Sequence, residues 1–217
     1  ASATCLAVVT VAAVLLVSST NAAAQGARIP TPGPILYAWM EREFHSNIYV
    51  KMPDEPDARM VHDEPGLIYQ AKWSPDGEYI SFATNVPGGG PRDTLSVMKA
   101  DGSALQRLVG DLNVERDPHA WGPGDREITY YDGGKDWDGN LWVIDVDDPQ
   151  APRKLSRGGG VFASPAWSPD RRQIAYSWSE DGRKMTIHVM DADGRNVTKI
   201  AKAEGFQPAW SRDGTEI

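Results

Sequence analysis

Cysteine is almost absent from this chain of 217 residues. Cys5 is the only one, and it precedes the first apolar run, whereas a lipoprotein signal needs its cysteine after that run. The sequence therefore excludes a disulfide-bonded scaffold and gives no reason to expect lipidation. A hydrophobic core must supply the stability of the folded protein, and the chain is long enough to bury one.

Positive charge is also scarce. The chain has 22 lysine and arginine residues against 30 aspartate and glutamate residues, so its formal net charge is −8. A nucleic-acid-binding domain needs a basic patch or stripe, and we therefore expect no nucleic-acid partner. Many of the aspartates lie in expected turns, which is typical of a solvated surface.

The chain has no long apolar run at its N-terminus, only a short one. The run at residues 6–17 is too short to span a bilayer and is followed by the small residues Ala22, Ala23 and Ala24. This pattern is typical of a secretory signal, so we predict a signal peptide at 1–24, cleaved after Ala24, and a linker at 25–34. An uncleaved anchor is the alternative. The prediction implies a periplasmic or secreted protein with no stable membrane span after signal removal. No initiator methionine or basic segment precedes the run, which indicates a fragment.

Catalytic motifs are absent too. The chain has no Gly-x-Ser-x-Gly nucleophile elbow, no His-Glu-x-x-His motif and no phosphate-binding glycine loop. Its four histidines, at positions 45, 62, 119 and 188, form no cluster with metal-ligand spacing. We therefore predict no catalytic residue and no cofactor within these 217 residues.

The most informative feature that is present is a phrase that occurs four times. It begins at Trp73, Trp121, Trp167 and Trp210, at intervals of 48 (73 to 121), 46 (121 to 167) and 43 residues (167 to 210), and continues as Ser-Pro-Asp-Gly or a variant. A period of about forty residues is the signature of a β-propeller with four-stranded blades. Because the tryptophans recur at one repeat position, we expect them to pack between blades.

Each phrase leads into an alternating strand pattern. Ile80, Ile128 and Ile174 stand seven residues after their tryptophans, and an aromatic residue follows two positions later. Both side chains therefore lie on one face of a strand. Proline, aspartate and glycine between tryptophan and isoleucine form a turn. Two further strand patterns complete each unit, and we expect no long helix between residues 35 and 217.

The predicted fold class is all-β, a β-propeller of four-stranded antiparallel blades. The repeats divide residues 35–217 into a partial blade at 35–66, blades at about 67–113, 114–160 and 161–204, and a partial blade at 205–217. The first unit lacks an inner strand, because no tryptophan stands seven residues before Ile35. Either the ring is incomplete, or the strand with Trp210 pairs with residues 35–39 and closes a ring of four blades.

Polar residues lie two or three positions before the repeat tryptophans, in the expected inner strands. They are Gln70, His119, Ser164 and Gln207. Inner strands surround the central channel of a propeller, so these side chains are candidates for contact with a ligand or partner at the channel mouth. The alternative is a solvated channel lining without a ligand.

An acidic segment is a weaker candidate, for a metal site. Asp132, Asp136 and Asp138 carry the oxygen ligands that hard cations prefer. The segment does not complete the EF-hand pattern, and it falls between the second and third strands of its unit, where a turn is expected. We therefore predict a turn here and no metal.

The repeat resembles that of a known family. The phrases Pro165-Ala-Trp167-Ser-Pro-Asp170, Ile174-Ala-Tyr176 and Ile187-His-Val189-Met190-Asp191-Ala-Asp193-Gly194 resemble the WD-like propeller repeat of the TolB family. The resemblance covers about residues 35–217, the propeller portion only. It implies a non-enzymatic platform that binds a protein or peptide at one face.

Two other functions fit the same repeat. Similar repeats form the propeller of prolyl-oligopeptidase-like serine peptidases, so the chain could be the propeller of an exported peptidase whose catalytic domain lies beyond Ile217. It could also bind or cleave an extracellular polysaccharide. Trp137, Trp142 and Trp178 lie off the repeat and would offer stacking surfaces for sugar, although packing between blades is the simpler role.

Overall fold

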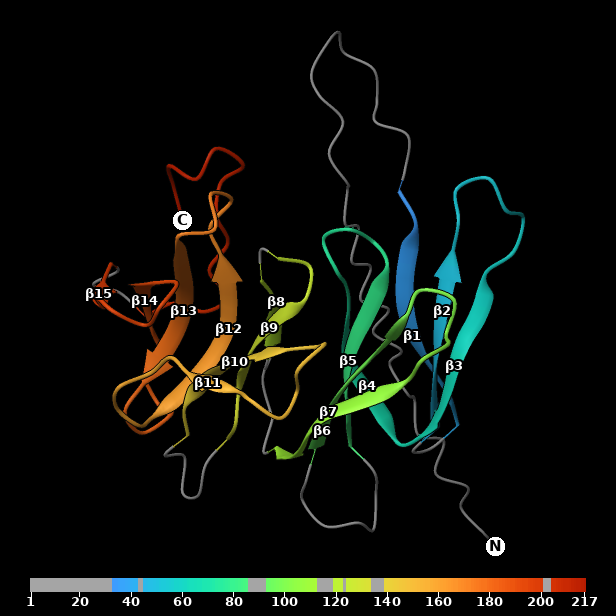
Figure 1. Ribbon diagram of the computed structural model, residues 1–217, viewed down its shortest axis with the longest axis horizontal. Helices are drawn as coiled ribbons and strands as arrows, with labels where there is room; N and C mark the ends of the chain where they lie inside the picture. The colour runs from blue at the N-terminus through green and yellow to red at the C-terminus, as the bar shows by residue number, and fades with distance from the viewer. Residues whose placement is uncertain are drawn as a thin grey trace, which may run out of the picture.

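The computed structural model in Figure 1 describes residues 33–42, 45–85, 93–112, 119–122, 124–133, 139–200 and 204–217. These ranges contain fifteen β-strands and no helix, so the prediction of an all-β fold is confirmed. It follows that no helix in the described ranges would reach across a lipid bilayer. The predicted signal peptide at 1–24 lies outside the described residues, as does the linker up to residue 32.

The strands form four antiparallel sheets, which we call blades 1 to 4. Blade 1 has the order β1-β2-β3, with β1 at Ile35–Arg42, β2 at His45–Lys51 and β3 at Arg59–Pro65. Blade 2 has the order β4-β5-β6-β7, with β4 at Leu67–Trp73, β5 at Tyr79–Asn85, β6 at Asp93–Lys99 and β7 at Gln106–Leu112.

Blades 3 and 4 repeat the same order. Blade 3 contains β8 at His119–Trp121, β9 at Glu127–Tyr131, β10 at Leu141–Asp145 and β11 at Arg153–Lys154. Blade 4 contains β12 at Val161–Trp167, β13 at Gln173–Ser179, β14 at Thr186–Asp191 and β15 at Thr198–Lys199. Every neighbouring pair is antiparallel, as a strand–turn–strand chain of short connections requires.

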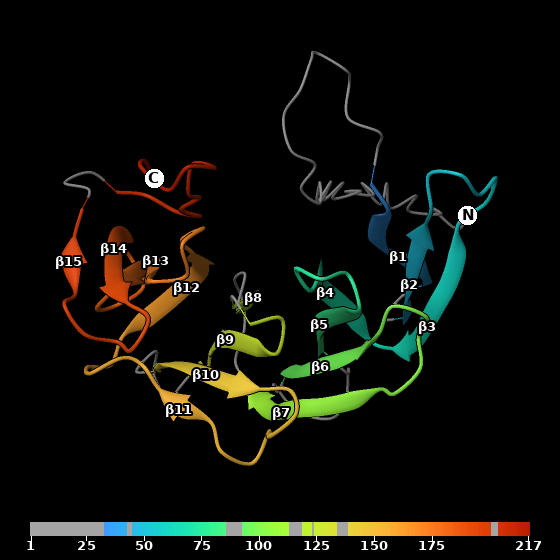
Figure 2. The same ribbon diagram turned by 45° about the horizontal axis from the view of Figure 1, so that its top comes forward.

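The four blades stand side by side along an open arc (Figure 2). Strands β4, β8 and β12 lie on the inner side of the arc, and β7, β11 and β15 lie on the outer side. The segment 204–217 lies beside blade 4, where the Trp210 indole N–H donates to the Ala166 carbonyl at 3.0 Å. Among the described residues β1 pairs only with β2. The alternative of a four-bladed ring closed by the Trp210 strand is therefore wrong, and the incomplete ring is the observed arrangement.

Apolar clusters fill the junctions between successive blades. The first cluster joins Leu36 and Ile48 of blade 1 to Ile80 and Phe82 of blade 2, and similar clusters join blade 2 to blade 3 and blade 3 to blade 4. The repeat isoleucines Ile80, Ile128 and Ile174 have no exposed surface. The core is therefore distributed along the arc, with each blade contributing one face to each neighbour.

The repeat tryptophans connect each blade to the one before it. The Trp121 indole N–H donates to the Lys72 carbonyl at 3.3 Å, and the Trp167 indole N–H donates to Thr129 Oγ1 at 3.0 Å. Trp121 is 9% exposed, while Trp73, Trp167 and Trp210 are half-buried. The rings of Trp121 and Trp167 thus pack in a junction while the indole N–H reaches an oxygen of the preceding blade.

Candidate functional site

Two inner strands contain a β-bulge at the same repeat position. In β4, Gln70 and the residue after it lie opposite Phe82 alone, because the register shifts between Tyr69 and Lys72. In β12, Ser164 and the residue after it lie opposite Tyr176 in the same way. A bulge redirects side chains and bends its strand, and bulges are enriched beside functional sites.

The first bulge residue has a left-handed backbone in each case. The φ angle is 53° at Gln70 and 49° at Ser164, and it is again 53° at Gln207, which stands at the same distance from Trp210. Residues other than glycine seldom adopt this conformation, which costs about 1–3 kcal/mol unless the surrounding structure holds it. Three of the four polar residues predicted for the channel mouth therefore share one conformation, on β4, on β12 and on the segment beside blade 4.

An exposed aromatic residue precedes each of the two glutamines. Tyr69 is 40% exposed and Phe206 is 53% exposed, and each stands four residues before a repeat tryptophan. Gln70 is half-buried and Gln207 is exposed, whereas Ser164 is buried. Neither aromatic residue was predicted from the sequence as a site residue, although the constant distance to tryptophan was the signal available. An aromatic surface next to a carboxamide can contact an apolar side chain and a peptide group at once.

Further polar groups lie at the same end of blade 2. The Asn85 side-chain amide donates to Asp93 Oδ1 at 2.7 Å, and Asp93 is 6% exposed. Burial, with the Asp93 charge as a second cause, raises the pKa of Tyr69, so its hydroxyl is neutral at physiological pH. Tyr69 therefore offers a neutral hydroxyl for hydrogen bonding, near the Asp93 carboxylate that Asn85 holds in place.

His119 behaves differently from the other three predicted residues. It has no exposed surface and stands two residues before Trp121, the position that Ala71 and Pro165 occupy in the neighbouring blades. Its Nε2 lies 2.9 Å from Ser81 Oγ of blade 2, and its carbonyl accepts a hydrogen bond from Lys72 Nζ at 2.6 Å. The hypothesis of a ligand contact therefore fails for His119, because the side chain is enclosed between blades 2 and 3.

The pair formed by Ser81 and His119 is not a catalytic dyad. Neither side chain is exposed, so no substrate can reach the Ser81 hydroxyl. The His119 Nδ1 is buried and has no hydrogen-bond partner among the described residues, so no carboxylate there orients the ring as in a hydrolase triad. Burial, followed by the charge of Lys72, holds the pKa of His119 well below its usual value, so the imidazole is neutral at pH 7.

The acidic segment is only partly within the described residues. Asp132 Oδ1 accepts a hydrogen bond from the Asn140 backbone N–H, and its Oδ2 accepts one from the Trp142 indole N–H, both at 2.7 Å. These bonds close the connection between β9 and β10. Asp136 and Asp138 lie outside the described ranges. In the part of the chain that the structure describes, no group of three or more potential metal ligands gathers.

The off-repeat tryptophans have polar partners within the blades. Trp142 donates to Asp132, and the Trp178 indole N–H donates to the Gly159 carbonyl at 3.3 Å. Both rings are packed against apolar clusters. Trp137 lies outside the described residues. Nothing in these contacts favours a sugar-stacking face.

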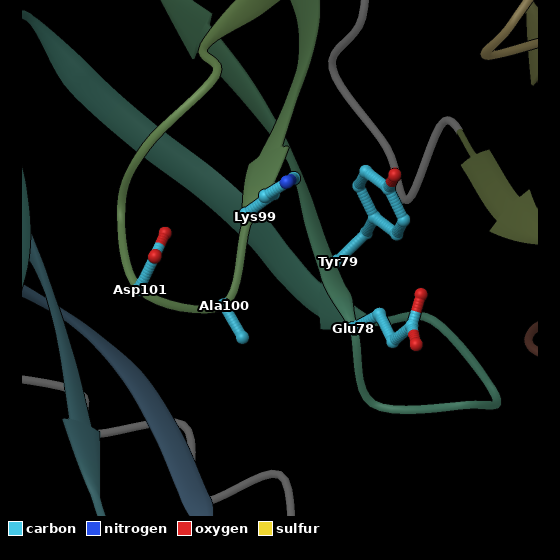
Figure 3. A pocket seen from close by; sticks show the side chains of 5 residues that line it. All are labelled: Glu78, Tyr79, Lys99, Ala100 and Asp101. Atoms are coloured by element: carbon cyan, nitrogen blue, oxygen red, sulfur yellow. The ribbon is translucent and has the colours of Figure 1, made fainter.

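A shallow depression of about 360 Å³ lies at the opposite end of blade 2 (Figure 3). It is lined by Glu78, Tyr79, Lys99, Ala100 and Asp101. Arg126 lies over the Tyr79 ring at 4.6 Å and pairs with Glu78 at 3.3 Å. Figure 3 shows the carboxylates of Glu78 and Asp101 on opposite sides of Ala100, so they do not converge on one ligand. We therefore place the candidate site at the bulges and not here.

Comparison with known proteins places the chain among propellers. No family model matches it. The Tol-Pal system protein TolB of Anaeromyxobacter dehalogenans is 33% identical over 120 residues, which cover 54% of this chain and 26% of that protein. The chain thus spans far less than two thirds of the relative that it matches.

Solved structures show the same fold at lower identity. TolB from Acinetobacter baumannii superposes with a TM-score of 0.67 and 13% identity, over 85% of this chain and 46% of that chain. A structure from a study of two prolyl endopeptidases superposes with a TM-score of 0.59 and 18% identity, over 80% of this chain and 28% of that one. Both kinds of protein therefore contain an arrangement of blades like that of Figure 2.

Proposed function

Since this chain is a TolB-like β-propeller, we propose that it is an exported, non-enzymatic platform that binds an extended protein segment at the mouth of its channel. The observation that carries the proposal is the aromatic–glutamine pair before the tryptophan, Tyr69–Gln70 and Phe206–Gln207. Each glutamine has the same left-handed backbone, and each aromatic ring is exposed.

The geometry suits a peptide better than a small metabolite. The pair lies on the inner strand of blade 2 and again on the segment beside blade 4, so it offers two separate contacts to a chain that runs across the inner strands. Aromatic rings bury large apolar area at low entropic cost, and carboxamides donate to and accept from peptide groups. Small-molecule sites are usually enclosed, whereas the aromatic rings here are open at the surface.

Export is part of the proposal. The apolar run at 6–17 followed by three alanines supports a secretory signal, and the chain's single cysteine at position 5 would leave with that signal. A periplasmic or secreted location agrees with this pattern. Mass spectrometry of the N-terminal peptide of the protein purified from its native host tests the predicted export. A cytosolic protein that still carries residues 1–24 would contradict it.

A peptidase propeller is the second candidate. The likeness to a prolyl endopeptidase structure supports it, since the blades superpose over 80% of this chain. In that case the mouth of the channel would face a catalytic domain of the same polypeptide. The polysaccharide alternative has no comparable support, because Trp142 and Trp178 pack within the blades.

One crosslinking experiment separates these functions. A photoreactive phenylalanine would replace Gln70 in the full-length protein in its native host, with the same residue at Leu105 as the control, because Leu105 is 52% exposed on a distant turn. An adduct with a second protein from position 70 alone is the expected result. An adduct only within the same polypeptide would favour the peptidase propeller. No adduct at position 70, or equal adducts at both positions, would overturn the platform.

A further inference from the structure

Two of the three junctions between blades are closed by a glycine turn. The turn between the third and fourth strands of a blade packs on the blade before it. An added Cβ would lie 2.1 Å from the Val61 carbonyl oxygen at Gly102 in blade 2, and 2.2 Å from the Leu155 carbonyl oxygen at Gly194 in blade 4. At these turns blade 2 therefore packs directly on the backbone of blade 1, and blade 4 packs directly on the backbone of blade 3.

The junction between blades 2 and 3 is built differently. Its turn carries Asp147 and Asp148 where the other two carry Asp-Gly. Arg126 bridges the blades instead, with pairs to Asp76 at 3.2 Å and to Glu78 at 3.3 Å. Ion pairs between exposed groups are weak and screened by salt, so these pairs hold the junction less firmly than a packed glycine turn.

The inner strands of this junction are held by polar contacts. Strands β4 and β8 contact each other less closely than β1 and β4 or β8 and β12. The apolar cluster of the junction draws its blade 2 members from β5, β6 and β7, away from the inner strand. Here the links are the bond between His119 of β8 and Ser81 of β5, and the bonds from Lys72 to the His119 carbonyl and from Trp121 to the Lys72 carbonyl.

His119 is the enclosed titratable group at this place. The charged or titratable side chains on the strands around it are Lys72 and Tyr69 on β4, Tyr79 on β5, and Glu127, Tyr130 and Tyr131 on β9; β12 has none. No carboxylate bonds to its ring among the described residues, since Nε2 meets Ser81 and Nδ1 has no partner there. An imidazolium ion in this position would have no exposed surface and would lie near the Lys72 ammonium group, and both the burial and the like charge are unfavourable.

We propose that the junction between blades 2 and 3 is an acid-sensitive hinge, which opens on the channel side when His119 takes up a proton. Opening lets water solvate the imidazolium ion of His119. It also breaks the hydrogen bond from Lys72 Nζ to the His119 carbonyl. The part of the apolar cluster away from the inner strands, which includes Leu95, Leu112 and Ile144, stays packed and acts as the pivot. The aromatic–glutamine pairs on the two sides of the hinge, Tyr69–Gln70 and Phe206–Gln207, then separate.

The direction of the pH effect follows from proton binding. The closed junction holds His119 neutral well below its ordinary pKa, whereas the open junction leaves the ring near its ordinary value of about 6.5. The open form therefore binds more protons below about pH 6.5, and the closed form loses stability as the pH falls through this range. The open population should rise by up to about tenfold for each pH unit below 6.5.

Hydrogen exchange of the full-length protein at pH 7.5 and 5.5 tests the hinge. After correction for the intrinsic pH dependence of exchange, amides of β8 and β4 should exchange up to about tenfold faster at pH 5.5, and amides of β12 should not change. The His119→Gln variant should lose this acceleration. The His188→Gln variant is the matched control, because His188 is a half-buried histidine of blade 4, and it should keep the acceleration.

Three results would overturn the hinge. They are an unchanged exchange rate in β8, an equal acceleration in β12, and an acceleration that persists in His119→Gln. If that variant does not fold, an NMR titration of the His119 ring in the wild-type protein replaces it. A ring that titrates without any change in β4 or β8 exchange would also contradict the proposal.

Discussion

Tryptophan at the start of each repeat has two roles that a smaller residue cannot combine. Its ring fills the junction with the preceding blade, and its indole N–H reaches an oxygen there, as Trp121 and Trp210 do with backbone carbonyls. Trp73 is the exception among the four, because its indole N–H has no such acceptor among the described residues. This N–H is buried where the described part of blade 1 shows no inner strand.

Replacing Trp121 by alanine should strongly destabilise the fold. The ring is 9% exposed and belongs to the apolar cluster between blades 2 and 3, so we expect a loss of about 3–5 kcal/mol in the free energy of unfolding. Trp39→Ala is the control, because Trp39 is 45% exposed on β1, and it should cost less than about 1 kcal/mol. Urea unfolding of both variants measures the difference, and equal losses would refute the packing role.

Alanine substitutions at two glycines with positive φ would distinguish the cost of backbone strain from the cost of a steric clash. Gly102→Ala should cost about 3 kcal/mol, because φ is +90° and the new methyl group would lie 2.1 Å from the Val61 carbonyl oxygen. Gly77→Ala should cost only about 1 kcal/mol, because φ is +75° and no atom lies within 4 Å of the added Cβ. Thermal unfolding of the two variants compares them directly. If Gly102→Ala were no worse than Gly77→Ala, the turn would not press on β3.

At the scale of the element, the Trp-Ser-x-Asp phrase forms one turn in three repeats. Ser168 Oγ donates to Asp170 Oδ1 at 2.7 Å and accepts from the Gln173 backbone N–H at 2.9 Å, and Ser74 and Ser211 occupy the same position. Blade 3 has Gly122 instead. An added Cβ there would lie 3.2 Å from Glu127 and 3.4 Å from the Trp167 ring, so a serine would require these neighbours to move by a few tenths of an ångström.

Removing the serine hydroxyl should weaken this turn in a pH-dependent way. Ser168 is 5% exposed, and Ser168→Ala should cost about 1–2 kcal/mol at pH 7, since the Gln173 N–H loses its acceptor. Hydrogen bonds from Ser168 and then from the Arg172 backbone N–H lower the pKa of Asp170. A lowered carboxylate pKa stabilises the fold above about pH 4 and ceases to do so as the pH falls through the folded value.

The difference between wild type and Ser168→Ala should therefore shrink below pH 4. Urea unfolding at pH 7 and pH 3 measures it, and NMR titration should show the pKa of Asp170 moving back towards its ordinary value. Ser103→Ala is the comparison, because the Ser103 hydroxyl lowers the pKa of Asp101 in an exposed turn but bridges no strand, so this variant should show the same pH dependence with a smaller loss at pH 7. A gap that stays constant between the two pH values would show that Asp170 is not coupled to the hydroxyl.

The strands could be predicted from the sequence because their signals are local. Alternation around Ile80 and the Pro-Asp turn fix a strand pair without reference to the rest of the chain. The bulges are less evident, because one extra residue shifts every side chain after it to the other face. His119 stands one position closer to its tryptophan than Gln70 does, and this single step separates an enclosed ring from a half-buried side chain.

At the scale of the whole molecule, ring closure could not be predicted because the angle between blades is a property of packing. Repeat length and strand order are compatible with rings of about four to eight blades. The angle depends on how closely each turn approaches the preceding blade, as Gly102 does at Val61. No sequence period reports that distance, and the open arc of Figure 2 emerges only from the assembled junctions.

The free edge of blade 1 should make residues 25–217, produced alone, associate. Strand β1 pairs only with β2 among the described residues, and Trp39 and Met40 on it are each 45% exposed. An unpaired strand with apolar side chains is a template for further pairing, and lysine on such an edge prevents it. Light scattering should therefore show a mass that rises with concentration for the unmodified segment and a monomer for the Ala38→Lys, Met40→Lys variant. Leu105→Lys, on an exposed turn of blade 2, should still associate. A concentration-independent monomer without these lysines would show that the β1 edge is already covered.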